Sequence, residues 1–138
     1  MVLIIDDEQI ILDTLRVLFE REGIITATES DPRKAVERYQ QGDFNVVLVD
    51  IVMPEMKGEE VIRAIKQVNP LCNIIVMTAY SSMQHVIDCI EAGAFDYVTK
   101  PLLDTDLLIK IVRQGLERAR RWRQSFGVFP LTAKQVSE

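Results

Sequence analysis

Short apolar segments that alternate with helical patterns constrain the fold of this chain most strongly. Three segments are continuously apolar and rich in β-branched residues, which is typical of strands buried on both faces of a sheet. They cover residues 2–5, 46–49 and 74–77. Two weaker segments, residues 24–27 and 95–99, suit strands at the edges of the sheet. The sequence therefore predicts five strands.

A helical pattern follows each of these segments. Apolar residues recur at spacings of three and four in residues 11–18, 35–39, 61–68, 86–90 and 108–116. Gly23 and Gly42 follow the first two patterns, and Pro70 follows the third, as expected at helix ends. Asp31 before Pro32 is typical of an N-cap and a first helical position. We therefore expect five helices.

A strand followed by a helix, five times over, predicts an α/β fold with a parallel sheet between two helical layers. Right-handed crossovers leave few ways to wind such a chain. We expect the flavodoxin-like (βα)5 doubly wound parallel sheet, with strand order 2-1-3-4-5. The 138 residues suit one such domain with a single core.

The fifth helical pattern continues beyond Leu116 to Trp122. Arginines gather there, at Arg118, Arg120, Arg121 and Arg123. We assign residues 1–120 to the domain, and residues 121–138 to the end of an extended fifth helix and a C-terminal tail or linker start. The extension is either a solvated helix end, which the helix dipole favours, or a linker or dimer helix with Ala119 and Trp122 in the contact.

Carboxylates stand directly after two of the predicted strands. Asp6 and Asp7 follow the first strand, and Asp50 ends the third. In open parallel sheets, ligands bind beyond the carboxyl ends of the strands at the point where the strand order reverses. In the expected order this point lies between the first and third strands, so the three carboxylates should converge in one crevice.

Such a cluster of like charges needs either raised pKa values or a bound hard cation. All-oxygen ligands without His or Cys favour Mg²⁺, with Mn²⁺ as its substitute. Lys100 ends the fifth strand before Pro101, at the same edge of the sheet. It can pair with Asp50 before a reaction and with a phosphoryl oxygen after it. Thr78 ends the fourth strand, where its hydroxyl can donate to an anion on Asp50.

These positions together resemble the receiver domain of two-component response regulators. The resemblance covers about residues 2 to 120 and is closest to receivers of nitrogen-regulation-type transcription activators. The matching segments are Leu3-Ile4-Ile5-Asp6-Asp7-Glu8, Val47-Leu48-Val49-Asp50 with Met53-Pro54 and Gly58, Met77-Thr78-Ala79, and Lys100-Pro101.

The resemblance implies a role for each of these residues. Asp50 would attack the phosphohistidine of a partner kinase. Asp7, Asp50 and the backbone carbonyl of Val52 would bind Mg²⁺ directly, and Asp6 would act through a metal-bound water. The Lys100–Pro101 peptide bond is often cis in this family.

The resemblance also implies a switch. Thr78 would turn toward the phosphoryl group and Tyr97 would swing inward behind it, which changes the surface of helix four, strand five and helix five. Val52 cannot position a water by hydrogen bonding and Tyr80 can shield the site. We therefore expect a rather long-lived phospho-aspartate. His85, the single histidine, is expected at the surface of the fourth helix without a catalytic role.

We expect a domain that catalyses only its own phosphorylation and dephosphorylation and is no other kind of enzyme. Its expected partners are a sensor histidine kinase or phosphotransfer protein, and an output domain or partner protein that acts in transcription regulation; a homodimer is an open alternative. The net charge of −5 argues against a nucleic-acid surface over the whole molecule but leaves room for a local basic patch. We expect no direct nucleic-acid binding by this domain. Two cysteines without metal-like spacing, no signal peptide and no membrane-length apolar run favour a cytoplasmic location.

Three other functions compete with this interpretation. A pseudo-receiver adaptor would bind partners without phosphorylation, although all the expected site residues are present. A flavin-binding electron carrier of the same topology would need Gly, Ser and Thr after the first strand, where Asp6, Asp7 and Glu8 would repel a phosphate. A phosphatase or other enzyme with an aspartyl intermediate would need a separate substrate-recognition segment, and the sequence shows no such segment. The cognate kinase and the pathway stay open.

Overall fold

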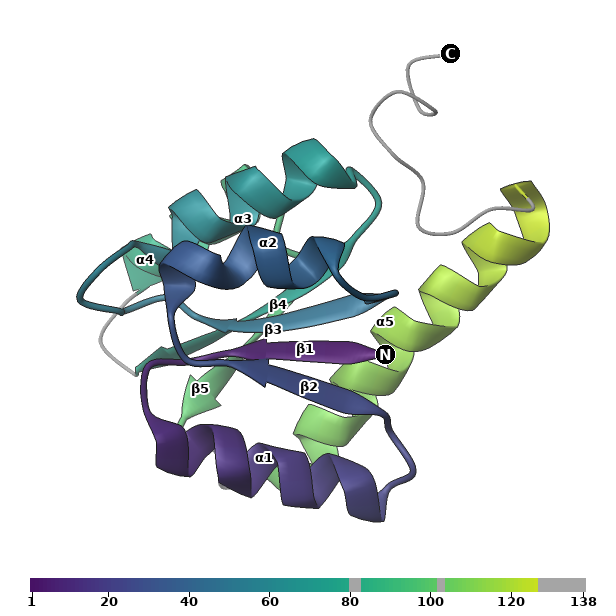
Figure 1. Cartoon of the computed structure of the whole chain (residues 1–138), viewed down its shortest axis with the longest axis horizontal. Helices are drawn as coiled ribbons and strands as arrows, with labels where there is room; N and C mark the ends of the chain where they lie inside the picture. The colour runs from purple at the N-terminus through teal and green to yellow at the C-terminus, as the bar shows by residue number, and fades with distance from the viewer. Residues whose placement is uncertain (80–82, 102–103, 127–138) are drawn as a thin grey trace.

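Five parallel strands form one sheet at the centre of the molecule in the computed structural model, which describes residues 1–79, 83–101 and 104–126 (Figure 1). The strands follow the order β2-β1-β3-β4-β5. Their bounds are β1 Val2–Ile5, β2 Thr26–Glu29, β3 Val46–Asp50, β4 Asn73–Ala79 and β5 Asp96–Lys100. The predicted fold class and strand order are therefore confirmed.

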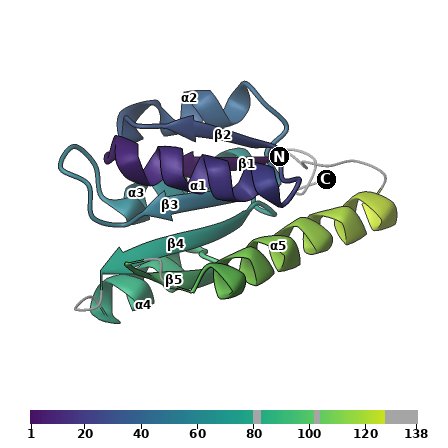
Figure 2. The same cartoon turned by 90° about the horizontal axis from the view of Figure 1, so that it is seen from below.

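Helices cover both faces of this sheet, as the two perpendicular views show (Figures 1 and 2). One face carries α1 (Gln9–Arg21) and α5 (Thr105–Phe126), and the other carries α2 (Ala35–Gln40), α3 (Gly58–Val68) and α4 (Met83–Ala92). A short 3-10 turn, η1 (Pro32–Lys34), precedes α2. None of the helices within the described ranges is long and apolar enough to cross a membrane.

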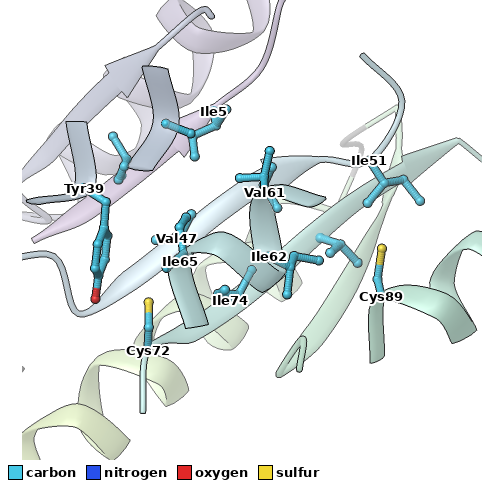
Figure 3. Packing of buried hydrophobic residues seen from close by; sticks show 14 of the residues in the cluster. Ile5, Tyr39, Val47, Ile51, Val61, Ile62, Ile65, Cys72, Ile74 and Cys89 are labelled. Atoms are coloured by element: carbon cyan, nitrogen blue, oxygen red, sulfur yellow. The ribbon is translucent and has the colours of Figure 1, made fainter. Parts of the chain in front are cut away.

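The central strands β1 and β3 have no exposed side chain, which explains their continuously apolar sequences. Alternate residues of these strands point to opposite faces and build two separate cores. Figure 3 shows the core beneath α2, α3 and α4, where Val47 and Ile74 of the sheet meet Ile62 and Ile65 of α3. The second core lies beneath α1 and α5.

The predicted helix ends are confirmed where the structure describes them. Gly23 adopts a φ of 73° after α1, and the N–H of Ile24 donates to the carbonyl of Phe19 at 2.9 Å. These are the features of a Schellman motif, which satisfies the last carbonyls of the helix. Asp31 accepts a hydrogen bond from the N–H of Arg33, as expected of an N-cap.

The predicted bounds of the second strand are wrong by two residues. Ile24 and Ile25 lie before β2, because Ile24 completes the end of α1 and is buried in the core beneath it. Ile25 is 69% exposed. The strand itself is the less apolar segment Thr26–Glu29, which suits its position at the edge of the sheet.

Helix α5 continues without a break across residue 120 to Phe126, so the boundary at that residue stays a prediction. The tail from residue 127 onward lies outside the described residues. Ala119 is only 2% exposed, which means that it packs against the domain and is not available for a contact with another molecule. Cys72 and Cys89 are buried, free thiols.

Candidate functional site

Three acidic side chains converge at the carboxyl ends of β1 and β3. Asp6 and Asp7 follow β1 directly, and Asp50 is the last residue of β3. The register pairs Ile5 of β1 with Val49 of β3, so the next residues along the chain, Asp6 and Asp50, lie beside each other. Each of the carboxylates of Asp6, Asp7, Glu8 and Asp50 offers an oxygen atom within 4.8 Å of the others.

The two inner carboxylates are buried and the two outer ones are exposed. Asp6 is 0% and Asp50 is 5% exposed, whereas Asp7 and Glu8 reach the surface. Burial raises the pKa of Asp50, and the charge of Asp6 raises it further, against the lowering effect of hydrogen bonds from Val52 and Lys100. Loss of hydration, together with the charges of Asp6 and Glu8, also raises the pKa of Asp7. The cluster therefore carries excess negative charge.

Lys100 brings one positive charge into this cluster. Its Nζ donates to Oδ2 of Asp6 at 2.8 Å and to Oδ2 of Asp50 at 3.0 Å. The carboxylate of Glu8 lies 4.0 Å away. Burial disfavours the ammonium, but the two buried carboxylates outweigh it and raise the pKa of Lys100. The Lys100–Pro101 peptide bond is cis.

Thr78 lies beside Asp50 on the neighbouring strand and is 2% exposed. Its hydroxyl donates to the carbonyl oxygen of Ala79 at 3.0 Å, so a hydrogen bond to an anion on Asp50 would require this hydroxyl to turn. Tyr80 lies outside the described residues. The roles expected of both residues stay predictions.

Val52 forms part of the wall beside Asp50. Its backbone N–H donates to Oδ1 of Asp50 at 3.1 Å, and its side chain is 55% exposed. Gly58 shapes this loop, because it donates its N–H to the carbonyl of Ile51 and a Cβ on it would lie 2.5 Å from the Cα of Ile51. The close approach of α3 to Ile51 therefore requires glycine at the start of this helix.

The structure does not bring Tyr97 into the site. Its side chain is 46% exposed on β5, three residues before Lys100. His85 is exposed on α4, as predicted. The sequence reasoning missed Glu8 as a fourth carboxylate of the cluster, although its position directly after Asp6 and Asp7 was the signal for it.

Among the described residues, this arrangement supplies oxygen donors for a cation, from several carboxylates and the nearby backbone. Hard divalent cations prefer such donors. A cation there would offset the excess negative charge that Lys100 leaves uncompensated. The residues present therefore fit a site for Mg²⁺ or Mn²⁺.

Comparisons with known proteins agree with this geometry. The family model described as the response regulator receiver domain matches residues 2–113. The chemotaxis protein CheY of Thermotoga maritima is 38% identical over 101 residues, which are 72% of this chain and 84% of CheY. The transcriptional regulatory protein ZraR of Escherichia coli K12 is 35% identical over 115 residues, which are 83% of this chain and 26% of ZraR. This chain thus spans about a quarter of ZraR.

Among solved structures, the receiver domain of NtrX from Brucella abortus superposes with a TM-score of 0.79 at 25% identity. The match covers 85% of this chain and 98% of that domain. The likeness to ZraR and NtrX confirms the resemblance to receivers of nitrogen-regulation-type transcription activators.

Proposed function

Because this chain belongs to the response regulator receiver domain family, we propose that Asp50 accepts a phosphoryl group from the phosphohistidine of a sensor histidine kinase or phosphotransfer protein. The observation that carries this proposal is the position of the Asp50 carboxylate. This carboxylate is buried beside Asp6, and the ammonium of Lys100 contacts both acids. The group lies at the carboxyl ends of the strands, where parallel sheets bind ligands.

The transfer needs a nucleophile and a counter-charge, and this chain supplies both. A carboxylate oxygen of Asp50 attacks phosphorus, and the bond between phosphorus and the imidazole nitrogen breaks with its electron pair left on that nitrogen. Lys100 then exchanges an oxygen of Asp50 for an oxygen of the phosphoryl group. The hydroxyl of Thr78 turns from Ala79 to donate to the same group, so the added charge gains two new partners.

Asp7, Asp50 and the carbonyl of Val52 would hold Mg²⁺, with Asp6 acting through a water on the ion. The cation supplies positive charge that screens the acids and stabilises the phosphoryl oxygens during transfer. The exposure of Asp7 and Val52 supports this assignment, because both residues reach the surface next to the buried carboxylates of Asp6 and Asp50. Mn²⁺ can replace Mg²⁺ in such a site.

The output surface that we propose comprises α4, β5 and α5. Recruitment of Lys100 and Thr78 by the phosphoryl group would pull on the ends of β5 and β4, and Tyr97 would turn inward from its exposed position. This surface would contact an output domain or partner protein in transcription regulation. Beyond its own phosphorylation and dephosphorylation, we propose no catalysis. The proposed kinase partner, and the free buried thiols, fit action in the cytoplasm.

Acetyl phosphate tests this proposal without a cognate kinase. Incubation of the protein with acetyl phosphate and Mg²⁺ should add the mass of one phosphoryl group, as intact-mass spectrometry would show. Asp50→Asn should abolish the added mass, and a metal chelator should prevent it. Asp96→Asn serves as the matched control, because Asp96 begins β5 at the opposite end of the strand from Lys100. Equal phosphorylation of Asp50→Asn and the wild type would disprove the assignment.

A further inference from the structure

A stack of three side chains joins the entry of β5 to the distal half of α5. The guanidinium of Arg118 lies over the ring of Phe95, 5.3 Å from its centroid, and over the ring of Trp122 at 4.5 Å. Both distances are within the range of cation–π attraction. Phe95 is the residue before β5, whereas Arg118 and Trp122 lie one turn apart on α5. We call Phe95, Arg118 and Trp122 the Arg118 stack.

The same stretch of α5 is held along the domain by other contacts. The side-chain amide of Asn73 donates to the carbonyl of Gly115 at 3.1 Å, and a Cβ on Gly115 would lie 2.9 Å from Val46. Ala119 is buried, and Arg123 pairs with Asp43 at 3.1 Å. In Figure 2 α5 runs back along the sheet and past the N-terminal edge of the strands. These contacts set the direction in which α5 leaves the domain.

Strand β5 connects the Arg118 stack to the acidic site. The strand runs from Asp96, next to Phe95, to Lys100, whose ammonium bridges Asp6 and Asp50. Within the part of the chain that the structure describes, it is an edge strand that pairs only with β4. Val98 is its one buried residue. Apart from the ladder with β4, Val98 is therefore the main side chain that holds β5 in the core.

We propose that the Arg118 stack couples the loading of the acidic site to the direction of the C-terminal half of α5. The inference rests on the proposed function, because it takes an anion on Asp50 as the event that moves Lys100. When Lys100 exchanges its contact with Asp50 for a contact with that anion, β5 shifts along its edge, the ring of Phe95 separates from Arg118, and α5 loses one of its attachments. A signal at the acidic site thus reaches the helix that leads out of the domain.

Trp122 reports on this stack directly, because it is the single tryptophan of the chain. The measurement combines two signals on the same sample, with Mg²⁺ and beryllofluoride as the probe. Fluorine NMR shows whether beryllofluoride is bound at the acidic site, and quenching of Trp122 fluorescence by acrylamide shows whether the stack has opened. The wild type should give a bound fluorine resonance, a red-shifted Trp122 emission and stronger quenching than without the probe.

Two variants and one control separate the stack from general effects on α5. Arg118→Met and Phe95→Leu each remove one partner, so Trp122 should be red-shifted and more strongly quenched before the probe is added, with no further change after it binds. Arg121→Met removes an exposed charge from the same helix turn and should respond like the wild type. The bound fluorine resonance should be present in all four proteins.

The outcomes that would overturn the coupling differ from those that would overturn the proposed function. A wild type with a bound resonance and an unchanged Trp122 signal contradicts the coupling alone. So does a full fluorescence response in Arg118→Met or Phe95→Leu. A wild type without a bound resonance contradicts the proposed function and the coupling together.

Discussion

At the residue scale, Asp50 combines burial with a surplus of negative charge around it. It shares Lys100 with Asp6, so one ammonium offsets two buried carboxylates. Removing one member of a buried ion pair usually lowers stability, because it leaves an unpaired buried charge. Here the removal of the Asp50 carboxylate leaves Lys100 paired with Asp6. The reactivity that we propose for Asp50 therefore comes at a cost in stability when no cation is present.

Asp50→Asn should stabilise the metal-free protein at neutral pH. In the wild type the pKa of Asp50 is raised above its ordinary value of 3.8, so the folded state holds this proton to a higher pH than the unfolded state does. The contribution of Asp50 to the free energy of unfolding therefore falls as the pH rises through its folded-state pKa. The variant lacks this loss. Urea unfolding in a chelator should show a gain of about 1 kcal/mol at neutral pH, which disappears below the ordinary carboxyl pKa.

Glu20→Gln is the matched control for this comparison, because Glu20 is exposed on α1. Its free energy of unfolding should stay within about 0.5 kcal/mol of the wild-type value at every pH. A loss of stability in Asp50→Asn at neutral pH would contradict the charge surplus that we infer at the site.

At the element scale, the approach of α3 to β3 fixes the loop that carries Val52. Gly58 begins α3 with its backbone against Ile51, the residue after Asp50. The close approach leaves no room for a side chain, since the nearest atom is a backbone Cα at 2.5 Å from the Cβ position. The geometry of the site thus depends on one contact between two elements.

Gly58→Ala should destabilise the protein by about 1–3 kcal/mol, because the added methyl group must push backbone aside. This loss exceeds the gain of up to about 1 kcal/mol that alanine brings to a helix. The variant should also bind Mg²⁺ more weakly, because Ile51 lies between Asp50 and Val52. Urea unfolding and metal titration would measure both effects. Gln67→Ala, at an exposed position of α3, should be close to neutral in both.

The elements that sequence patterns predicted well are those whose burial is uniform. The residues of β1 and β3 are all buried, so their apolar sequences show the strand directly. Around β2 the pattern failed, because Ile24 serves the end of α1 and not the strand. Apolar character shows that a residue is buried, but not which element buries it.

The site was partly predictable for a related reason. Asp6, Asp50 and Lys100 stand at strand ends, and a parallel sheet brings such positions together whatever the details of packing. The hydrogen bond from Thr78 to Ala79 and the exposure of Tyr97 depend on side-chain conformations that no pattern encodes. The contact of Arg118 with Phe95 exists only in the folded domain, because an entire strand and most of a helix separate the two residues.

At the scale of the whole molecule, the acidic site should make stability depend on divalent cations. A cation that binds only the folded state stabilises it by mass action, by about 1.4 kcal/mol at a concentration tenfold above its Kd. Mg²⁺ should therefore raise the Tm of the wild type. Asp7→Asn and Asp50→Asn should reduce this shift strongly, whereas Glu20→Gln should retain it. Equal shifts in all four proteins would mean that Mg²⁺ binds elsewhere.

The fold joins this site to a long helix at the far side of the domain. Lys100 ends β5 at the acidic cluster, and α5 returns along the sheet to the opposite edge (Figures 1 and 2). The chain spans about a quarter of ZraR, and an output domain or partner protein that receives the signal from α5 is our proposal for this protein. A shift at the start of β5 would also move Phe95, which contacts Arg118 of α5.

The phospho-acceptor role of Asp50 is tested by locating the phosphoryl group on the chain. After treatment with acetyl phosphate and Mg²⁺, borohydride reduces an acyl phosphate at aspartate to homoserine, which peptide mass spectrometry identifies by position. We predict homoserine at position 50 and at no other aspartate, with none formed when Mg²⁺ is chelated. Homoserine at Asp6 or Asp7 instead, or phosphate on His85, would contradict the assignment of Asp50 as the phospho-acceptor.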